Sequence, residues 1–255
     1  MTGKLDKLWA TKAKDDEWWS SFVTSPVAIA ANFVVAEQNW ITPNRITGMS
    51  FLVAVAAAVF VIVGGYPNFI KAAVLIHISH VLDCMDGQLA RYRQTSSPIG
   101  SYLDRVSDQV QVTLWFGAAA YASFTQSGSV VPVFLALIGI AFYGLRGYIK
   151  YISIEFEMAQ NPGYANGIAN GTKAKTVAGL GFGLRSNVQW FVREQPKILQ
   201  FNEGVFIFIL TAALLLDALE PMLWIFAVSQ VFWGLFRAVE GGLRIRHNNQ
   251  HPIQK

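Results

Sequence analysis

Long apolar stretches alternate with short polar ones along most of the chain. A helix needs roughly 20 residues to cross a bilayer core about 30 Å thick. Six stretches approach that length, and we take them as candidate spans over residues 48–66, 69–91, 100–121, 130–156, 205–219 and 222–237. The first and the last two are almost wholly apolar, whereas the second and third contain aspartates. The pattern predicts an all-α integral membrane protein with six transmembrane helices.

The segment before the first span has a different pattern. It begins with charged residues, continues with Trp18 and Trp19, and then has an apolar stretch that leads to Trp40. Tryptophans that flank an apolar stretch are typical of a helix in the membrane interface, and a soluble helical cap is the alternative. We therefore expect an N-terminal segment with an interfacial amphipathic helix, a six-helix membrane domain and a polar tail, over residues 1–47, 48–245 and 246–255.

Basic residues are distributed unevenly among the connections. Lys and Arg are concentrated before the first span, between the second and third, after the fourth and after the sixth, whereas the other connections hold only Lys71. Cytoplasmic loops carry an excess of Lys and Arg. The distribution predicts a multi-pass protein of a cell inner membrane with both termini in the cytoplasm.

Composition agrees with the membrane class. Hydrophobic residues make up 53% of the chain and charged residues 14%, against roughly 25% charged residues in a typical soluble domain. Disordered and collagen-like chains are thereby excluded. The net charge is +4, but so few charges cannot build the broad basic surface that nucleic acid requires, and we expect no nucleic-acid partner. Cys84, the single cysteine, excludes a disulfide framework.

Four aspartates lie within two neighbouring candidate spans. Asp83 and Asp86 are three residues apart, and Asp104 and Asp108 are four apart, so each pair shares one helix face. A charge in the centre of a membrane helix costs about 2.5–3.5 kcal/mol on insertion scales. A short turn makes the two helices antiparallel neighbours, so both pairs can converge near the cytoplasmic side. Ligation by oxygen alone favours Mg²⁺ or Mn²⁺, and four carboxylates can hold two such ions.

Small and basic residues accompany the aspartates. Gly87, Ala90 and Gly100 permit the close approach of a helix or a ligand. Arg91 lies one turn nearer the cytoplasm, where a phosphate group would arrive from solution. Metal ions, a small pocket and an arginine together describe a site for a nucleoside diphosphate.

The complete pattern is Asp83-x-x-Asp86-Gly87-x-x-Ala90-Arg91, then eight residues, then Gly100-x-x-x-Asp104-x-x-x-Asp108. It resembles the signature of the CDP-alcohol phosphotransferases, also called CDP-alcohol phosphatidyltransferases. The run Pro43-Asn44-Arg45-Ile46-Thr47 resembles the element that opens the first span in many members. The resemblance covers roughly residues 40–240.

This resemblance implies an enzyme of phospholipid biosynthesis that cleaves a CDP-linked alcohol, usually CDP-diacylglycerol, and releases CMP. The substituted phosphoryl group passes to the hydroxyl of a second alcohol, and members are commonly homodimers. By the resemblance, Asp83, Asp86 and Asp104 ligate metal, while Asp108 contacts the second metal ion and acts as the general base. The implied contacts to CDP are Asn44, Thr47, Asp83, Gly87, Ala90, Arg91 and Gly100.

The acceptor is less well defined by the sequence. A phosphorylated acceptor would need basic residues near the metal site, and the candidates are Arg146, Lys150, Lys173, Lys175 and Arg185. Ordinary loop charge is the alternative for these residues. Members that use inositol phosphate resemble Tyr-x-Lys-x-Arg-x-Glu, where this chain has Ser153 and Glu155. That departure argues against inositol phosphate.

Three other interpretations remain open at this level. The donor can be a CDP-activated polar head group, with a lipid alcohol as the acceptor. The aspartates can couple an ion in a membrane transporter, or belong to a non-catalytic scaffold. Release of CMP with Mg²⁺ would distinguish the enzyme from the transporter.

His77 and His80 form an i, i+3 ladder with Asp83, which suggests a transition-metal site, although a hydrogen-bonded packing role is favoured.

Overall fold

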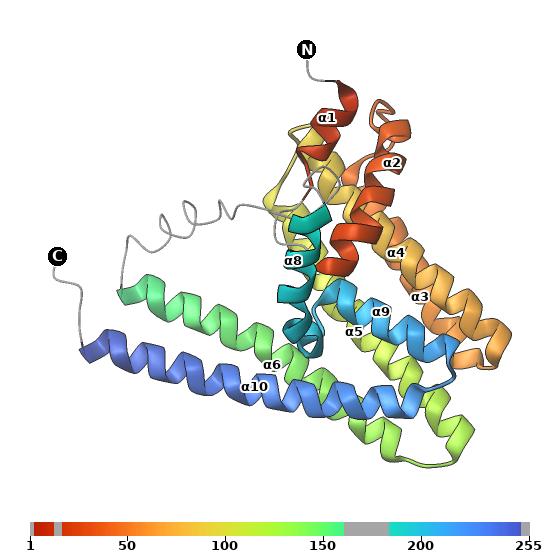
Figure 1. Cartoon of the computed structure of the whole chain (residues 1–255), viewed down its shortest axis with the longest axis vertical. Helices are drawn as coiled ribbons and strands as arrows, with labels where there is room; N and C mark the ends of the chain where they lie inside the picture. Colours follow the sequence, from red (N-terminus) through yellow and green to blue (C-terminus); the bar gives the residue numbers. More distant parts are fainter. Residues whose placement is uncertain (1–2, 13–16, 161–183, 251–255) are drawn as a thin grey trace.

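Figure 1 shows the computed structural model, which describes residues 3–12, 17–160 and 184–250. The described residues form helices and short connections, without a β-strand. In chain order, the elements are α1 (Lys4–Trp9), the π-helical turn η1 (Ser20–Thr24), α2 (Ser25–Val35), α3 (Pro43–Val63), α4 (Tyr66–Tyr92), α5 (Pro98–Ser127), α6 (Val131–Gln160), α8 (Leu184–Glu194), the 3-10 helix η2 (Gln195–Gln200), α9 (Glu203–Leu215) and α10 (Leu219–Gln250).

Four of the described helices are long and apolar enough to cross a membrane. They are Pro43–Val63, Tyr66–Tyr92, Val131–Ala159 and Leu219–Arg246. The third predicted span falls in α5, which has the length but a more polar composition, and the fifth falls in α9, which has 13 residues and rises only about 20 Å. Several apolar helices thus indicate a multi-pass membrane protein, and the full count of six spans stays a prediction.

Local sequence explains where α3 and α5 begin and where the chain turns between α3 and α4. Thr42 caps α3, because its hydroxyl accepts a hydrogen bond from the Arg45 amide at 3.4 Å. Ser97 caps α5 in the same way, at 3.1 Å from the Gly100 amide. Proline occupies the first turn of both helices, where its missing N–H costs nothing. Gly64 and Gly65, with φ of 74° and 82°, make the sharp turn between α3 and α4.

The core sets α5 between the α3–α4 hairpin and α10. Ala54 and Ala72 are fully buried, and such small side chains let α3 and α4 approach closely. The Trp115 indole donates to the Ala54 carbonyl at 3.0 Å, which ties α5 to α3. On the other side, the rings of Phe116 and Phe226 stack with centroids 3.8 Å apart. These contacts tie the middle of α5 to α3 on one side and to α10 on the other.

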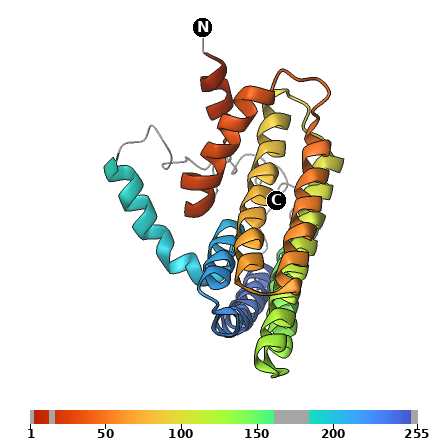
Figure 2. The same ribbon diagram turned by 90° about the vertical axis from the view of Figure 1, so that its right-hand side faces the viewer.

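The N-terminal segment packs on α4. Figure 2 shows α1 and α2 at the end of the molecule where α4 ends. The side-chain amide of Asn32 donates to the Met85 carbonyl at 3.0 Å, and the side-chain amide of Gln88 donates to the Ser25 carbonyl at 3.3 Å. Buried polar contacts of this kind fix α2 along α4. The interfacial position of this segment stays a prediction.

Packing of α6 against α10 leads to the first testable expectation. The two helices lie side by side and run in the same direction (Figure 1). A Cβ at Gly139 of α6 would overlap the Phe226 ring, and that ring cannot move freely because it stacks on Phe116. We expect Gly139→Ala to lower the free energy of unfolding by about 1–3 kcal/mol, measured by thermal unfolding in detergent.

The matched control is Gly117→Ala, since a Cβ there meets nothing within 4 Å. The control should be neutral or stabilising, because alanine has the higher helix propensity. Equal unfolding temperatures for Gly139→Ala and the control would show that the α6–α10 contact is not as close as described.

Candidate active site

Three carboxylates meet between α4 and α5. Asp83, Asp104 and Asp108 each place an oxygen within 4.8 Å of the other two. The Oδ1 atoms of Asp83 and Asp108 are buried, with no hydrogen-bond partner among the described residues. Buried polar atoms normally have a partner, and a hard divalent cation accepts oxygen ligands of this kind. The donor set therefore fits Mg²⁺ or Mn²⁺.

The fourth predicted ligand lies one turn further along α4. Asp86 is buried and lies outside the group of three. Its carboxylate accepts a hydrogen bond from the Thr47 hydroxyl, and the same hydroxyl lies 3.2 Å from the Pro43 carbonyl. Thr47 thus connects Asp86 to the start of α3, so the structure brings together two residues that are 39 positions apart in the chain.

The small residues of the signature leave space beside the acids. A Cβ at Gly87 would lie 3.2 Å from Nη1 of Arg91, so the guanidinium extends back over this glycine. A Cβ at Gly100 would lie 3.7 Å from the Asn44 side-chain oxygen, which places Asn44 beside the start of α5. Ala90 is half-buried, and its carbonyl accepts from the Thr95 amide at 2.9 Å.

The arginines at the end of α4 also bind the N-terminal segment. Arg91 Nε donates to the Thr11 carbonyl at 2.7 Å, and Arg93 Nη1 donates to the Ile41 carbonyl at 2.6 Å. Glu37 accepts from the Tyr92 hydroxyl at 2.9 Å and pairs with Lys4 at 3.4 Å. The Tyr92 hydrogen bond, assisted by Lys4, lowers the pKa of the Glu37 carboxyl. These contacts place the segment before α3 next to Arg91.

A cavity of about 1290 Å³ lies between α5, α6 and α10, and Asp108 forms part of its wall. Asp108 is thus common to the acidic group and to this cavity. Five basic side chains line the cavity: Arg105, Arg146, Lys150, Arg237 and Arg244. Glu157 and Glu240 of the same wall pair with Arg237 and Arg244, and Arg105 and Lys150 have no such ion pair among the described residues. An anionic or strongly polar molecule suits such a wall.

The proposed acceptor residues differ in their surroundings. Arg146 donates to the Gln200 carbonyl and, at 2.6 Å, to the Gln230 side chain. Lys150 is exposed and lines the cavity. Arg185 is on α8, which packs against the N-terminal segment through Trp18 and Phe191, with ring centroids 5.4 Å apart, and it is not among the described residues of the cavity wall. Lys173 and Lys175 lie outside the described residues.

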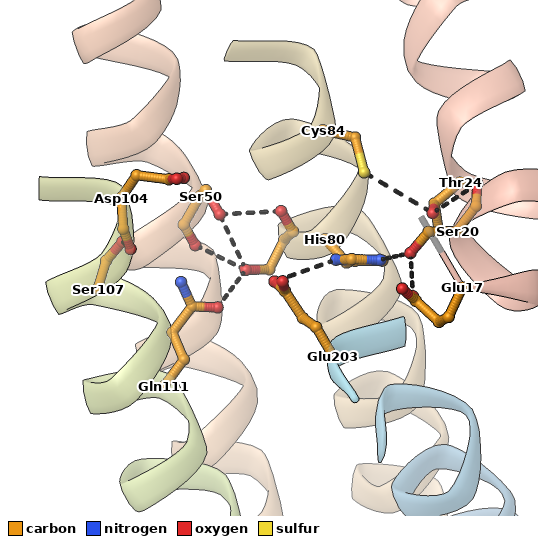
Figure 3. A network of polar contacts seen from close by, with 11 residues as sticks. Glu17, Ser20, Thr24, Ser50, His80, Cys84, Asp104, Ser107, Gln111 and Glu203 are labelled. Carbon is orange, nitrogen blue, oxygen red and sulfur yellow. Dashed lines mark hydrogen bonds and ion pairs between the residues drawn. The ribbon is translucent and has the colours of Figure 1, made fainter. Parts of the chain in front are cut away.

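Sequence reasoning missed a polar network around His80, which lies one turn before Asp83 on α4 (Figure 3). His80 Nδ1 lies 3.6 Å from a carboxylate oxygen of Glu203 at the start of α9. His80 Nε2 lies 2.8 Å from the Ser20 hydroxyl, which donates to Glu17. Burial raises the pKa of the Glu17 carboxyl, against the opposing effect of the Ser20 hydrogen bond. Glu203 is an acid just before an apolar stretch, and this signal would have flagged it.

Together, the buried carboxylates of α4 and α5 and the cavity beside them form a site that could hold divalent cations. The chain belongs to the CDP-alcohol phosphatidyltransferase family, because the family model matches residues 40–236. The resemblance found in the sequence is thereby confirmed.

Three curated relatives illustrate the range of the family. The bifunctional IPC transferase and DIPP synthase of Thermococcus kodakarensis is 27% identical over 51% of this chain and 29% of its own length. Choline/ethanolaminephosphotransferase 1 of Arabidopsis thaliana is 28% identical over 51% and 34%. CDP-diacylglycerol–serine O-phosphatidyltransferase of Saccharomyces cerevisiae is 23% identical over 65% and 63%. The chain spans less than two thirds of the length of each of these relatives.

Proposed function

We propose that this protein transfers a substituted phosphoryl group from a CDP-alcohol to the hydroxyl of a second alcohol and releases CMP. CDP-diacylglycerol is the proposed donor. The observation that carries the proposal is the group of buried carboxylates from α4 and α5, one of which also lines a large basic cavity. Membership of the CDP-alcohol phosphatidyltransferase family supports the same chemistry.

The proposed ligands for two Mg²⁺ or Mn²⁺ ions are Asp83, Asp86, Asp104 and Asp108. Bound there, the ions would neutralise the diphosphate and stabilise the leaving CMP. The buried Oδ1 atoms of Asp83 and Asp108 support this assignment. Thr47 fixes the position of the Asp86 carboxylate through its hydrogen bond.

Asp108 is the proposed general base because it faces both the acidic group and the cavity. The acceptor oxygen would bond to the phosphorus of the substituted phosphoryl group as the bond to the CMP phosphate breaks, and the proton would pass to Asp108. An aspartate is a weak base for an alcohol. It can accept this proton late, when bonding to phosphorus has made the proton acidic.

CDP is proposed to lie over the small residues of the signature. Gly87, Ala90 and Gly100 would leave space for the nucleotide, Asn44 and Thr47 would border it, and Arg91 would hold the diphosphate together with a metal ion held by Asp83. Arg91 is suited to this role because Nε is engaged by Thr11, while the terminal nitrogens lie beside Gly87. The N-terminal segment would thus orient the guanidinium.

The acceptor is proposed to enter the basic cavity, where Lys150 and Arg146 are candidate contacts. Lys150 is the better placed for direct contact, since Arg146 already donates to Gln200 and Gln230. Arg185 would reach an acceptor only if the acceptor extends toward α8. A CDP-activated head group as donor, with a lipid alcohol as acceptor, is the competing assignment, and the name of the Arabidopsis relative is consistent with it.

We propose a homodimer in a cell inner membrane, with both termini in the cytoplasm, as the distribution of Lys and Arg favours. The proposed organisation is an N-terminal segment, a membrane domain and a short tail, over residues 1–47, 48–245 and 246–255.

The direct test is an assay of CMP release by purified protein in lipid nanodiscs. CDP-diacylglycerol and CDP-choline are supplied separately with Mg²⁺ and a panel of alcohols, including serine, glycerol 3-phosphate and inositol. Release of CMP from CDP-diacylglycerol, and its loss with EDTA, would support the proposal. No CMP from any pair, together with ion-dependent uptake into proteoliposomes, would favour a transporter instead.

The glycine beside Arg91 gives a prediction on donor affinity. In Gly87→Ala, the new methyl group would lie 3.2 Å from Nη1 of Arg91 and require the guanidinium to shift, so the affinity for CDP in the presence of Mg²⁺ should fall about 10-fold, the scale of one methyl group in a fitted pocket. Equilibrium binding of radiolabelled CDP measures the change. Gly48→Ala is the control, since a Cβ there meets nothing within 4 Å. Unchanged affinity in Gly87→Ala would remove this glycine from the CDP site.

A further inference from the structure

We propose that His80, Asp83 and Glu203 form a second site, adjoining the acidic group at Asp83, for a divalent transition-metal ion. The three residues each offer one ligand atom, and these atoms lie within 4.8 Å of one another. This proposal goes beyond phosphoryl transfer and does not depend on it, because it concerns a mixed nitrogen–oxygen donor set that shares only Asp83 with the group of Asp83, Asp104 and Asp108. Imidazole nitrogen suits Mn²⁺, Fe²⁺, Co²⁺ or Zn²⁺ better than it suits Mg²⁺.

The orientation of His80 is the first argument. The Ser20 hydroxyl has one hydrogen, which it donates to Glu17. Ser20 must therefore accept from His80 Nε2, 2.8 Å away. In a neutral imidazole with hydrogen on Nε2, the lone pair of Nδ1 points toward the Glu203 carboxylate. A lone pair facing a carboxylate is unfavourable unless a metal ion lies between them or Nδ1 itself carries a proton.

The second argument is the series of hydrogen bonds that links Glu17, Ser20 and His80, because a metal-bound histidine has similar surroundings. Such histidines almost always donate their other N–H to a hydrogen-bond acceptor, which fixes the tautomer and the ring. Here the Ser20 oxygen is the acceptor, and Glu17 holds the Ser20 hydroxyl in place. Ser20 and His80 are both buried, so this orientation is well defined.

The third argument is that Asp83 and Glu203 supply negative charge, and that Glu203 gives an ion a path from the outside. Asp83 Oδ1 is buried without a hydrogen-bond partner among the described residues, so its lone pairs are available to a cation. The Glu203 side chain, in contrast, is 39% exposed. The site therefore opens to the outside at Glu203 and is closed at His80, whose side chain is 3% exposed.

Close packing holds Glu203 in this position. A Cβ at Gly204 would overlap the Glu17 carboxylate and lie 2.5 Å from the Ser20 hydroxyl oxygen. The missing side chain at Gly204 lets the start of α9 approach η1, which brings Glu203 toward His80. The competing account is a simple ion pair between a protonated His80 and Glu203, with a structural role.

Pulsed EPR of bound Mn²⁺ separates these accounts. The purified protein in nanodiscs receives excess Mg²⁺, which occupies sites made of oxygen alone, and then substoichiometric Mn²⁺. Electron spin echo modulation detects a nitrogen bound directly to Mn²⁺. We expect nitrogen modulation in the wild type, and its replacement by the ¹⁵N pattern when the protein is grown with ¹⁵N-histidine. This labelling changes no side chain, so it does not depend on the folding of a variant.

Two histidine variants assign the signal. His80→Gln should lose the nitrogen modulation, whereas the control His77→Gln should keep it, because His77 Nδ1 already lies 3.0 Å from the Ala73 carbonyl. Ser20→Ala should weaken Mn²⁺ binding by about 10–100-fold, the usual effect of removing a partner of a metal-bound histidine.

Wild-type Mn²⁺ without nitrogen modulation would overturn the proposal and leave the ion pair as the account of His80. Nitrogen modulation that persists in His80→Gln would also overturn it. CMP release with Mg²⁺ alone is measured on the same preparations. Failure of that assay would count against the proposed phosphoryl transfer, and not against the mixed site.

Discussion

Replacement of Asp108 by asparagine is expected to lower CMP release by about 10²–10⁴-fold, the range attributed to a general base. The affinity for CDP in the presence of Mg²⁺ should change much less, because Asp83 and Asp104 remain at the acidic group. CMP release should fall because the side-chain amide of asparagine cannot take up the proton of the acceptor hydroxyl. Single-turnover CMP release and equilibrium CDP binding, measured on the same preparation, separate the two effects.

Asp217→Asn is the matched control. Asp217 lies in the turn between α9 and α10, has a φ of 51°, and accepts from the Gln126 amide at 2.8 Å. Asparagine tolerates this left-handed backbone conformation, and the residue is remote from the acidic group in sequence and in its contacts. Full activity in Asp108→Asn would exclude Asp108 as the base, and equal losses in both variants would point to a general effect of the substitution on folding.

The second large effect is expected for Asp83→Asn. Asp83 belongs both to the group with Asp104 and Asp108 and to the group with His80 and Glu203. We expect the variant to lose CMP release and the stabilisation by Mg²⁺, which for a bound ion at a hundredfold excess over Kd is about 2.7 kcal/mol. Thermal unfolding with Mg²⁺ and with EDTA measures this difference.

The effect of Asp83→Asn on the unfolding temperature should have opposite signs in EDTA and in Mg²⁺. Without a cation, the Asp83 charge is buried among other carboxylates, which is unfavourable. Asp83→Asn removes that repulsion and should unfold at a higher temperature than the wild type in EDTA, and at a lower temperature in Mg²⁺. A Mg²⁺-dependent shift of wild-type size in Asp83→Asn would show that the ion binds elsewhere.

Much of the fold follows from the sequence because helices in a bilayer must satisfy their own backbone hydrogen bonds. Apolar runs therefore located α3, α4, α6 and α10. Their ends were harder to predict, since hydropathy reports the apolar part of a helix and not its length. The sixth predicted span ends at residue 237, whereas α10 continues to Gln250 as a more polar helix. The cap at Thr42 starts α3 before the predicted residue 48.

The acidic group was predictable for a local reason. Asp83, Asp104 and Asp108 lie on two helices joined by a short turn, so the spacing of the residues and the direction of the helices together imply convergence. The separation of Asp86 from this group was not predictable, because it depends on the Thr47 hydroxyl of another helix.

The network around His80 was hidden from sequence reasoning. Glu17 and Glu203 come from distant parts of the chain, and their approach depends on the packing of η1 against α9 at Gly204. A single sequence indicates which residues share a helix face. It does not indicate which other helix packs over that face. The sequence favours a hydrogen-bonded packing role for His80, and the hydrogen bond with Ser20 is consistent with that role as well as with the proposed metal site.

The central claim is that carboxylates of α4 and α5 hold divalent cations, and that these cations hold the cytidine donor. Calorimetric titration of CDP into the purified protein tests this claim most directly. The account predicts saturable binding in Mg²⁺ that disappears in EDTA and in Asp83→Asn. Equal affinity for CDP with and without divalent cations would contradict it.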